Sequence, residues 1–243
     1  MSLLFEGAIA VKAAMLSGNR EVHEIIIDSK RKDKDTAFIK RQAESRNIPV
    51  TLKSREEIDE LASKTTHGGI LAYVGERKYQ TLDNVYENEN PFVCILEGIE
   101  DPYNFAYMLR SLYAAGCNGV IVGERNWSTA GDIIAKGSAG ASEYIPIIVT
   151  SDFEATIHSL KEHGVTLFSA MRTDDSIPYY EANFTKGCCI AIGGEMRGLS
   201  KIIRNETDCN IYIPYANDFR NSLTATGAGS VLGFEVSRQR NMK

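Results

Sequence analysis

Short apolar runs alternate with segments whose apolar residues recur at helical spacing. In the first part of the chain this pattern predicts strands at residues 24–27, 49–52 and 70–74, and helices at residues 7–17, 35–46 and 55–63. Ser54 with Glu57 three residues later is a capping box, which indicates where the third helix begins. These elements predict a compact α/β module at residues 1–78, followed by a polar linker at residues 79–90.

The second part of the chain, residues 91–243, shows the same alternation with more strongly apolar strands. We expect strands at residues 92–96, 119–122, 145–149, 165–170, 188–192 and 211–213, with helical segments between most of them. Strands without polar positions are typical of a sheet that is covered on both faces. Alternating strands and helices predict parallel pairing with right-handed crossovers, so the expected fold class is α/β.

The helix that follows the strand at residues 92–96 carries two polar residues of interest. Asp101 and Pro102 mark its start and Gly116 its end, and the spacing predicts one buried stripe made of Phe105, Leu109, Leu112 and Tyr113. Asn104 and Arg110 lie on the same helix. Arg110 directly follows Leu109, so it is either an arginine at the margin of the buried stripe or a guanidinium that holds a phosphate or steers a hydroxyl.

Hydroxyl residues predict the starts of three later helices. Ser128 or Thr129 is a candidate cap for a helix that reaches Lys136, and Ser151 with Glu154 forms a second capping box. Ser222 is a candidate cap for the final helix, which is rich in alanine and glycine.

The strand exits near the C-terminus predict a small-molecule pocket. The strand at residues 188–192 runs into Gly193 and Gly194, where bare backbone can approach a ligand, and the strand ending at Ile213 stops at Pro214. We expect these exits and the start of the last helix to form one pocket, built mostly from main-chain groups. The two glycines also fit a plain tight turn, and Glu195 also fits a carboxylate near a helix dipole.

Composition narrows the class of protein. The net charge of −5 argues against a protein that binds nucleic acid over its whole surface, although residues 1–80 hold 14 Lys and Arg against 12 Asp and Glu. This local excess fits either a solvated face or a patch that binds a folded RNA. Its candidate RNA-binding residues are Lys30, Arg31, Lys32, Lys40 and Arg41.

Cysteine and histidine spacing indicates neither a disulfide framework nor a metal site. The five cysteines form no CxxC pair, so we expect reduced, buried thiols in a cytoplasmic protein. The four histidines lack the spacing of zinc ligands. No apolar run reaches the roughly 20 residues that span a bilayer, and the first residues do not resemble a signal peptide, so no membrane partner is expected.

Three separated segments resemble the motifs of the SpoU-TrmH family of SPOUT methyltransferases, which are RNA ribose 2′-O-methyltransferases. The segments are Glu97 to Arg110 with the following Ala-Ala-Gly, then Gly193 to Leu199, and then Ile213-Pro214 with Ser222-Leu223. The small-residue segment from Lys136 to Glu143 also fits, and residues 1–78 resemble the family's substrate-binding domain. Each motif alone is weak, but three in the right order are specific.

The resemblance implies a deep trefoil knot in residues 91–243 and a homodimer packed through the knotted domains, with one subunit completing the other's site. It implies that S-adenosylmethionine is held by backbone groups at Gly193, Ile213 and Leu223, with Ala170 near the adenine. It also implies that Gly194, Pro214 and Thr224 belong to this cofactor site. Arg110 matches the catalytic arginine, and Asn104, Glu195 and Ser222 are placed around it.

The predicted activity is therefore S-adenosylmethionine-dependent 2′-O-ribose methylation of a structured RNA. Ribosomal RNA is the first candidate substrate and transfer RNA the second. Either Arg110 or an RNA phosphate that Arg110 orients would receive the hydroxyl proton. The alternative is a knotted RNA-binding protein that has lost methylation, because Thr224 stands where the family usually has asparagine. An oxidoreductase ranks third, since the glycine fingerprint of a dinucleotide fold is absent.

Overall fold

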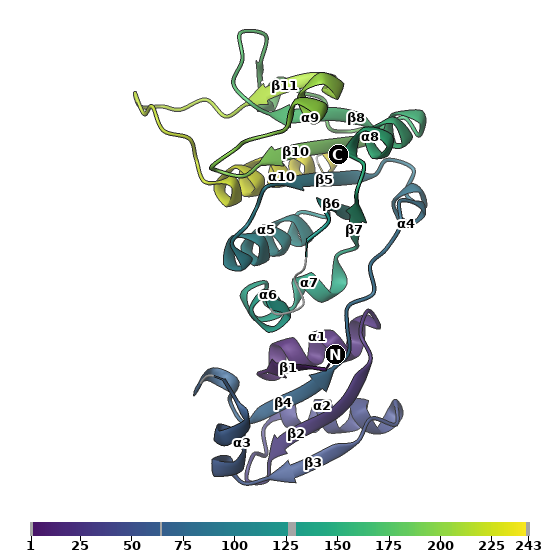
Figure 1. Cartoon of the computed structure of the whole chain (residues 1–243), viewed down its shortest axis with the longest axis vertical. Coiled ribbons are helices and arrows are strands. Elements are labelled where there is room, and N and C mark those ends of the chain that lie inside the picture. Colours follow the sequence, from purple (N-terminus) through teal and green to yellow (C-terminus); the bar gives the residue numbers. More distant parts are fainter. Residues whose placement is uncertain (1, 64, 126–129, 242–243) are drawn as a thin grey trace. The chain divides into compact units, whose positions relative to one another are not determined.

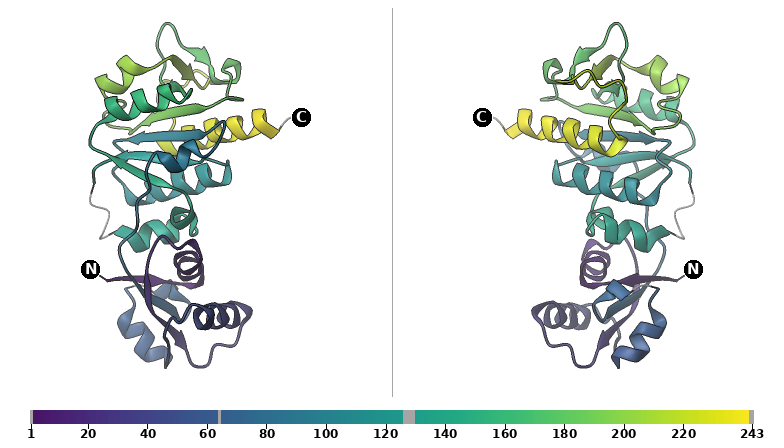
Figure 2. Two further views of the ribbon diagram at one scale, coloured as in Figure 1. Left: turned by 90° about the vertical axis from the view of Figure 1, so that its right-hand side faces the viewer. Right: turned by 90° about the vertical axis from the view of Figure 1, so that its left-hand side faces the viewer.

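The computed structural model describes residues 2–63, 65–125 and 130–241, which form two compact units (Figure 1). The N-terminal unit comprises residues 1–78 together with residues 126–144, and the C-terminal unit comprises residues 79–125 and 145–243. Figure 2 shows the elements of each unit from two further sides. The helix cap predicted at Ser128 or Thr129 lies outside the described residues.

A four-stranded mixed sheet forms the N-terminal unit. Its strand order is β1-β4-β2-β3, where β1 is Leu3–Glu6, β2 is Val22–Asp28, β3 is Val50–Lys53 and β4 is Ile70–Val74. β4 pairs antiparallel with β1 and β2, while β2 and β3 are parallel. The helices are α1 (Ala8–Ser17), α2 (Lys34–Ser45) and α3 (Arg55–Leu61), with a 3₁₀ turn at Thr65–His67. The predicted Ser54–Glu57 capping box is confirmed at the start of α3.

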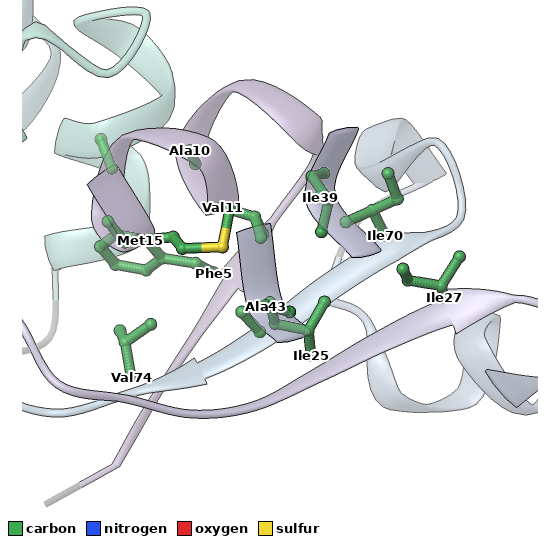
Figure 3. Packing of buried hydrophobic residues seen from close by; sticks show 13 residues of the cluster. Phe5, Ala10, Val11, Met15, Ile25, Ile27, Ile39, Ala43, Ile70 and Val74 are labelled. Carbon is green, nitrogen blue, oxygen red and sulfur yellow. The ribbon is translucent and has the colours of Figure 1, made fainter. Parts of the chain in front are cut away.

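The core of this unit lies between the sheet and the helices α1 and α2 (Figure 3). Val11 and Met15 of α1 and Ile39 of α2 pack with Ile25 and Phe5 from the strands. Burying an aliphatic side chain of this size contributes about 1.5–3 kcal/mol. The strand β1 was not predicted; it contributes Phe5, which is fully buried.

Two later helices complete the N-terminal unit: α6 (Gly131–Gly137) and α7 (Ala141–Tyr144). The backbone N–H of Glu6 donates to Asp132 Oδ1 at 3.2 Å. Glu143 is buried, accepts from Arg20 Nε at 2.9 Å, and lies 3.5 Å from Arg77 Nη1. A buried carboxylate requires such cationic partners, so this contact ties residues from the middle of the chain to the N-terminal sheet.

The C-terminal unit is a seven-stranded sheet in the order β7-β6-β5-β10-β8-β11-β9. Every strand pair in it is parallel, so the predicted parallel α/β fold is confirmed. The strands are β5 (Phe92–Glu97), β6 (Gly119–Gly123), β7 (Ile147–Thr150), β8 (Thr166–Ala170), β9 (Ile177–Pro178), β10 (Cys188–Gly193) and β11 (Cys209–Tyr212). The helices are α4 (Asp83–Tyr86), α5 (Pro102–Ala114), α8 (Phe153–Glu162), α9 (Lys201–Glu206) and α10 (Ala225–Asn241), with a 3₁₀ turn at Tyr179–Glu181.

Helices cover this sheet on both faces. Ile157 of α8 and Ile203 of α9 pack on one face, together with Val93 and Ile95 of β5. α5 and α10 pack closely against each other, because a Cβ at Gly229 would lie 2.1 Å from Met108 Sδ. The central strands β5 and β10 are thereby buried, as their unbroken apolar sequences predicted.

Residues 79–90, predicted as a linker, pack on the C-terminal sheet. The N–H of Gln80 donates to Ile147 O at 2.9 Å, and Val85 of α4 is fully buried. Tyr86 Oη lies 2.7 Å from Ser159 Oγ of α8.

Three local predictions were wrong. Tyr113, expected in the buried stripe of α5, is 44% exposed because it lies at the margin of that stripe. The cap of α8 is Asp152, whose carboxylate accepts from Ala155 N at 3.0 Å, rather than Ser151. The hydroxyl that accepts from the first turn of α10 belongs to Thr224 rather than Ser222.

The cysteines follow the prediction of reduced thiols. All five are free, and four of them are buried. Burial raises the pKa of the Cys188 thiol to about 12, so this group remains protonated at neutral pH. Among the described residues, none of the helices combines the length and the apolar character needed to cross a bilayer. The trefoil knot stays a prediction.

Candidate active site

A cavity of about 880 Å³ lies in the C-terminal unit, where β8, β10 and β11 end and α10 begins. Small-molecule sites typically measure about 300–1,000 Å³ and often lie at the carboxyl edge of a parallel sheet. The strand exits from which we predicted a pocket therefore do enclose one.

The glycines at the end of β10 are required by packing. A Cβ at Gly193 would lie 2.4 Å from the carbonyl carbon of Gly198, and a Cβ at Gly194 would lie 2.1 Å from Gly98 O. Real Cβ atoms do not approach backbone so closely, so any side chain would push two segments apart. Both glycines also line the cavity. Gly193 and Gly194 therefore both allow the tight turn and leave bare backbone along the cavity.

Hydrogen bonds join the first predicted motif to the second. The N–H of Gly194 donates to Glu97 O at 2.7 Å, and the N–H of Ser200 donates to Glu97 Oε2 at 2.6 Å. Gly198 closes the turn by donating its N–H to Gly194 O at 2.9 Å. The end of β5 thus fixes the turn that forms one wall of the cavity.

The loop between β11 and α10 forms another part of the cavity lining. Tyr215 Oη accepts a hydrogen bond from the N–H of Leu223 at 2.9 Å, which closes the loop into a ring. Thr224 Oγ1 accepts from the N–H of Gly227 at 3.1 Å and so caps α10. Both side chains therefore hold this part of the cavity lining in place.

Most predicted site residues come together around this cavity. It is lined by Ala170, Gly193, Gly194, Glu195, Ile213, Ser222, Leu223 and Thr224, whereas Pro214, Asn104 and Arg110 are not among its lining residues. Asn104 is half-buried on α5, and its backbone N–H donates to Asp101 Oδ1 at 2.8 Å. Arg110 is exposed on the same helix. Whether these residues act in catalysis stays a prediction.

The cavity includes residues that the sequence analysis missed. Arginines at positions 172, 197, 204 and 220 line it, as do Tyr215 and Phe219. Arg172 comes two residues after the end of β8, and a search for polar residues at carboxyl strand ends would have found it. Arg204 comes from the middle of α9, where no sequence signal marks it.

The predicted RNA-binding residues lie on or before α2 in the N-terminal unit. Lys30, Lys32, Lys40 and Arg41 are exposed. Arg31 is bound to Asp33 and to Gly68 O, so part of its guanidinium is used within the fold. The hydrogen bond from Arg31, with that from the Thr36 amide, lowers the pKa of Asp33 to about 2.

One cluster of side chains in the described part of the chain has metal-ligand geometry. Glu154, His158 and Glu206 place ligand atoms within 4.8 Å of one another at the surface. Lys161 Nζ lies 3.4 Å from Glu206 Oε2 and 3.1 Å from Asp208 Oδ1. Lys161 therefore forms ion pairs with Glu206 of this cluster and with Asp208.

Comparison with known proteins identifies the family. A model of the SpoU rRNA Methylase family matches residues 91–234, and a model described as RNA 2'-O ribose methyltransferase substrate binding matches residues 4–80. The chain belongs to the SpoU rRNA methylase family. The resemblance found in the three motifs is thereby confirmed, and with it the class of RNA methyltransferases.

Relatives match along nearly the whole chain. A Staphylococcus saprophyticus protein named as a member of the TrmH family of tRNA/rRNA methyltransferases is 32% identical, over 98% of this chain and 96% of its own. The crystal structure of the SpoU methyltransferase AviRb from Streptomyces viridochromogenes, solved in complex with the cofactor AdoMet, has a TM-score of 0.79 at 20% identity. That match covers 99% of this chain and 91% of AviRb. An rRNA methyltransferase from Sinorhizobium meliloti has a TM-score of 0.80 at 20% identity, over 98% of this chain and 87% of its own.

Proposed function

We propose that this protein transfers a methyl group from S-adenosylmethionine to a ribose 2′-hydroxyl of RNA. Ribosomal RNA is the first candidate substrate and transfer RNA the second. The observation that carries the proposal is the cavity whose walls are formed by the turn after β10 and by the loop before α10. Family membership supports RNA as the substrate. The substrate-binding match at residues 4–80 supports the ribose hydroxyl as the acceptor.

The cavity fits S-adenosylmethionine in size and in the kind of groups that it offers. Its volume of about 880 Å³ lies in the range of small-molecule sites. Gly193 and Gly194 expose peptide groups on one side, and Ile213 and Leu223 line the cavity beside them. AviRb, which shares the fold, was solved with AdoMet. When bound, the cofactor supplies an electrophilic methyl group on a sulfonium.

The protein's contribution is to hold the acceptor hydroxyl in line with that methyl group and to assist loss of its proton. Glu195 and Ser222 line the cavity and are available to position the ribose. Arginine is protonated at neutral pH, so Arg110 would orient an RNA phosphate that takes the proton or would steer the hydroxyl itself.

We further propose that the active unit is a homodimer in which Arg110 acts on the partner's cavity. Arg110 is exposed and does not line the cavity of its own subunit. The helices α5 and α10 expose large apolar side chains, with Tyr107 at 46% and Phe234 at 51%. Apolar patches of this kind are typical of subunit interfaces.

The test is methyl transfer from tritiated S-adenosylmethionine to unmodified ribosomal and transfer RNA, followed by digestion to nucleosides. The proposal predicts label on the ribose, with more on ribosomal RNA. Label on a base would refute the ribose assignment. Tight binding of RNA without methyl transfer, in a protein that also fails to bind the cofactor, would support the inactive RNA-binding alternative.

A further inference from the structure

The cavity carries more positive charge than its proposed cofactor accounts for. Its lining arginines come from four places: Arg172 follows β8, Arg197 lies in the turn after β10, Arg204 lies on α9, and Arg220 lies in the loop before α10. The lining carboxylates are Glu195 and Asp218. Across residues 2–63, 65–125 and 130–241, none of the four guanidinium groups forms an ion pair with a carboxylate.

The cofactor's own charge makes this excess informative. S-adenosylmethionine carries a sulfonium, an ammonium and a carboxylate, so its net charge is one positive. One arginine could bind the carboxylate, but the others would repel a cation. A polyanion is the partner that several guanidinium groups around one cavity favour, because each can hold a phosphate through two parallel hydrogen bonds.

An exposed aromatic ring lies beside these arginines. Phe219 lines the cavity, yet 51% of it is exposed to solvent. Its backbone N–H donates to Asn217 O at 2.8 Å, and its ring centre lies 6.0 Å from that of Tyr215. The loop that carries Phe219 is the yellow-green segment between β11 and α10 in Figure 1. An exposed ring in a loop that is tied at both ends offers a fixed stacking surface.

We propose that Phe219 and the four arginines form a binding rim for unpaired RNA, separate from the lysines and arginines of the N-terminal unit. This inference rests on the proposed function and names the form of RNA that it accepts. A base next to the target nucleotide stacks on Phe219, and the flanking phosphates bind the arginines, Arg220 first because it is adjacent in the chain. Paired bases are stacked within a helix and cannot reach Phe219, so the rim selects single strands, loops and bulges.

The test measures binding of a fluorescent single-stranded RNA of about 12 nucleotides, and of the same strand annealed to its complement. The variants are Phe219→Ala, Phe219→Trp and Arg220→Ala, with Lys186→Ala as a control that removes one exposed charge from the same unit outside the cavity. Affinities are measured from about 50 to 200 mM salt, so that phosphate contacts appear as the slope of log affinity against log salt. Cofactor affinity is measured in parallel by calorimetry.

We expect the wild type to prefer the single strand. Phe219→Ala should weaken single-strand binding about tenfold or more, whereas Phe219→Trp should retain it. Arg220→Ala should reduce the salt slope by about 0.7, the value for one phosphate of a single strand, while Lys186→Ala leaves the slope unchanged. Lys186→Ala should also leave cofactor binding unchanged, because Lys186 is exposed and does not line the cavity.

Equal affinity for the single strand and the duplex, no binding of the single strand at low salt, or wild-type behaviour of both Phe219→Ala and Arg220→Ala would each overturn the inference. The proposed function fails by a different result. If the wild type binds the single strand through Phe219 but transfers no methyl group, the result supports the binding rim and refutes the enzymatic proposal. If methyl transfer is normal in Phe219→Ala and Arg220→Ala at limiting RNA, the result supports the enzymatic proposal and refutes the binding rim.

Discussion

Replacing Gly194 by alanine tests how the first two motifs form the cavity wall. The added Cβ would lie 2.1 Å from Gly98 O and 2.6 Å from Gly98 C. Because non-bonded carbon contacts need about 3.5 Å, the two backbones would have to separate by roughly 1 Å. Overpacking of this kind costs about 1–3 kcal/mol, and two backbone segments yield less easily than a flexible side chain, so we expect a cost near 3 kcal/mol.

The same displacement would move the peptide groups of Gly193 and Gly194 away from a bound ligand. We therefore expect Gly194→Ala to weaken S-adenosylmethionine binding by at least about tenfold, or ~1.4 kcal/mol. Urea unfolding followed by circular dichroism measures the loss of stability, and calorimetry measures the loss of affinity.

Gly123→Ala is the matched control, since Gly123 also ends a strand of the same sheet. A Cβ there would meet only the Phe153 ring, at 3.5 Å, which is an ordinary contact. This variant should lose less than about 0.5 kcal/mol. If Gly194→Ala unfolds at the same urea concentration as Gly123→Ala and binds the cofactor equally well, close packing of the two motifs is not the reason for glycine at this position.

Four further predictions follow from single contacts. Glu143→Ala should cost about 3 kcal/mol or more in urea unfolding because it removes the buried partner of Arg20, while the exposed Glu154→Ala should change little; a loss below about 1 kcal/mol would contradict the buried ion pair. The folded-state pKa of Asp33, about 2 against an ordinary 3.8, stabilises the fold above pH 3.8, and this contribution is lost as the pH falls towards 2. Thermal unfolding at several pH values should accordingly show a weaker acid dependence for Asp33→Asn than for the wild type, and identical profiles would refute it. Tyr215→Phe, which removes the acceptor of the Leu223 N–H, should weaken cofactor binding about three- to tenfold in calorimetry, with Tyr79→Phe unchanged; equal affinities would show that the ring of the loop does not shape the site. Mass spectrometry after iodoacetamide treatment should find Cys209, which is partly exposed, alkylated before the buried Cys188 and Cys189, and the reverse order would contradict their burial.

The sequence predicted the central strands of the C-terminal sheet well because they are buried on both faces, whereas the two-residue strand β9 was not predicted. Runs such as Phe92–Leu96 and Cys188–Ile192 have one stable environment, so hydrophobicity alone locates them. The strand β1 was missed because Leu3–Glu6 is short and ends in Glu6, a buried carboxylate. The burial of the Glu6 carboxylate depends on Ser63, whose N–H donates to Glu6 Oε1 at 2.6 Å. Ser63 lies 57 residues later in the sequence, so no local pattern reveals this partner.

The candidate site was predictable where backbone geometry constrains residue type, and less so elsewhere. Gly193 and Gly194 are recognisable because two consecutive glycines directly follow an apolar strand. The structure shows that a side chain at either position would collide with backbone. Arg204 and Phe219 reach the cavity through the positions of α9 and the loop before α10, which only tertiary structure gives. The role of Thr224 as a cap was hidden because Ser222 is as good a capping residue and lies two positions earlier.

A crystal structure with S-adenosylhomocysteine tests the central claim most directly. We predict the ligand in the cavity between the turn after β10 and the loop before α10, with hydrogen bonds to main-chain groups of Gly193, Ile213 and Leu223. A ligand bound outside this cavity, or held there without contact to these peptide groups, would contradict the account.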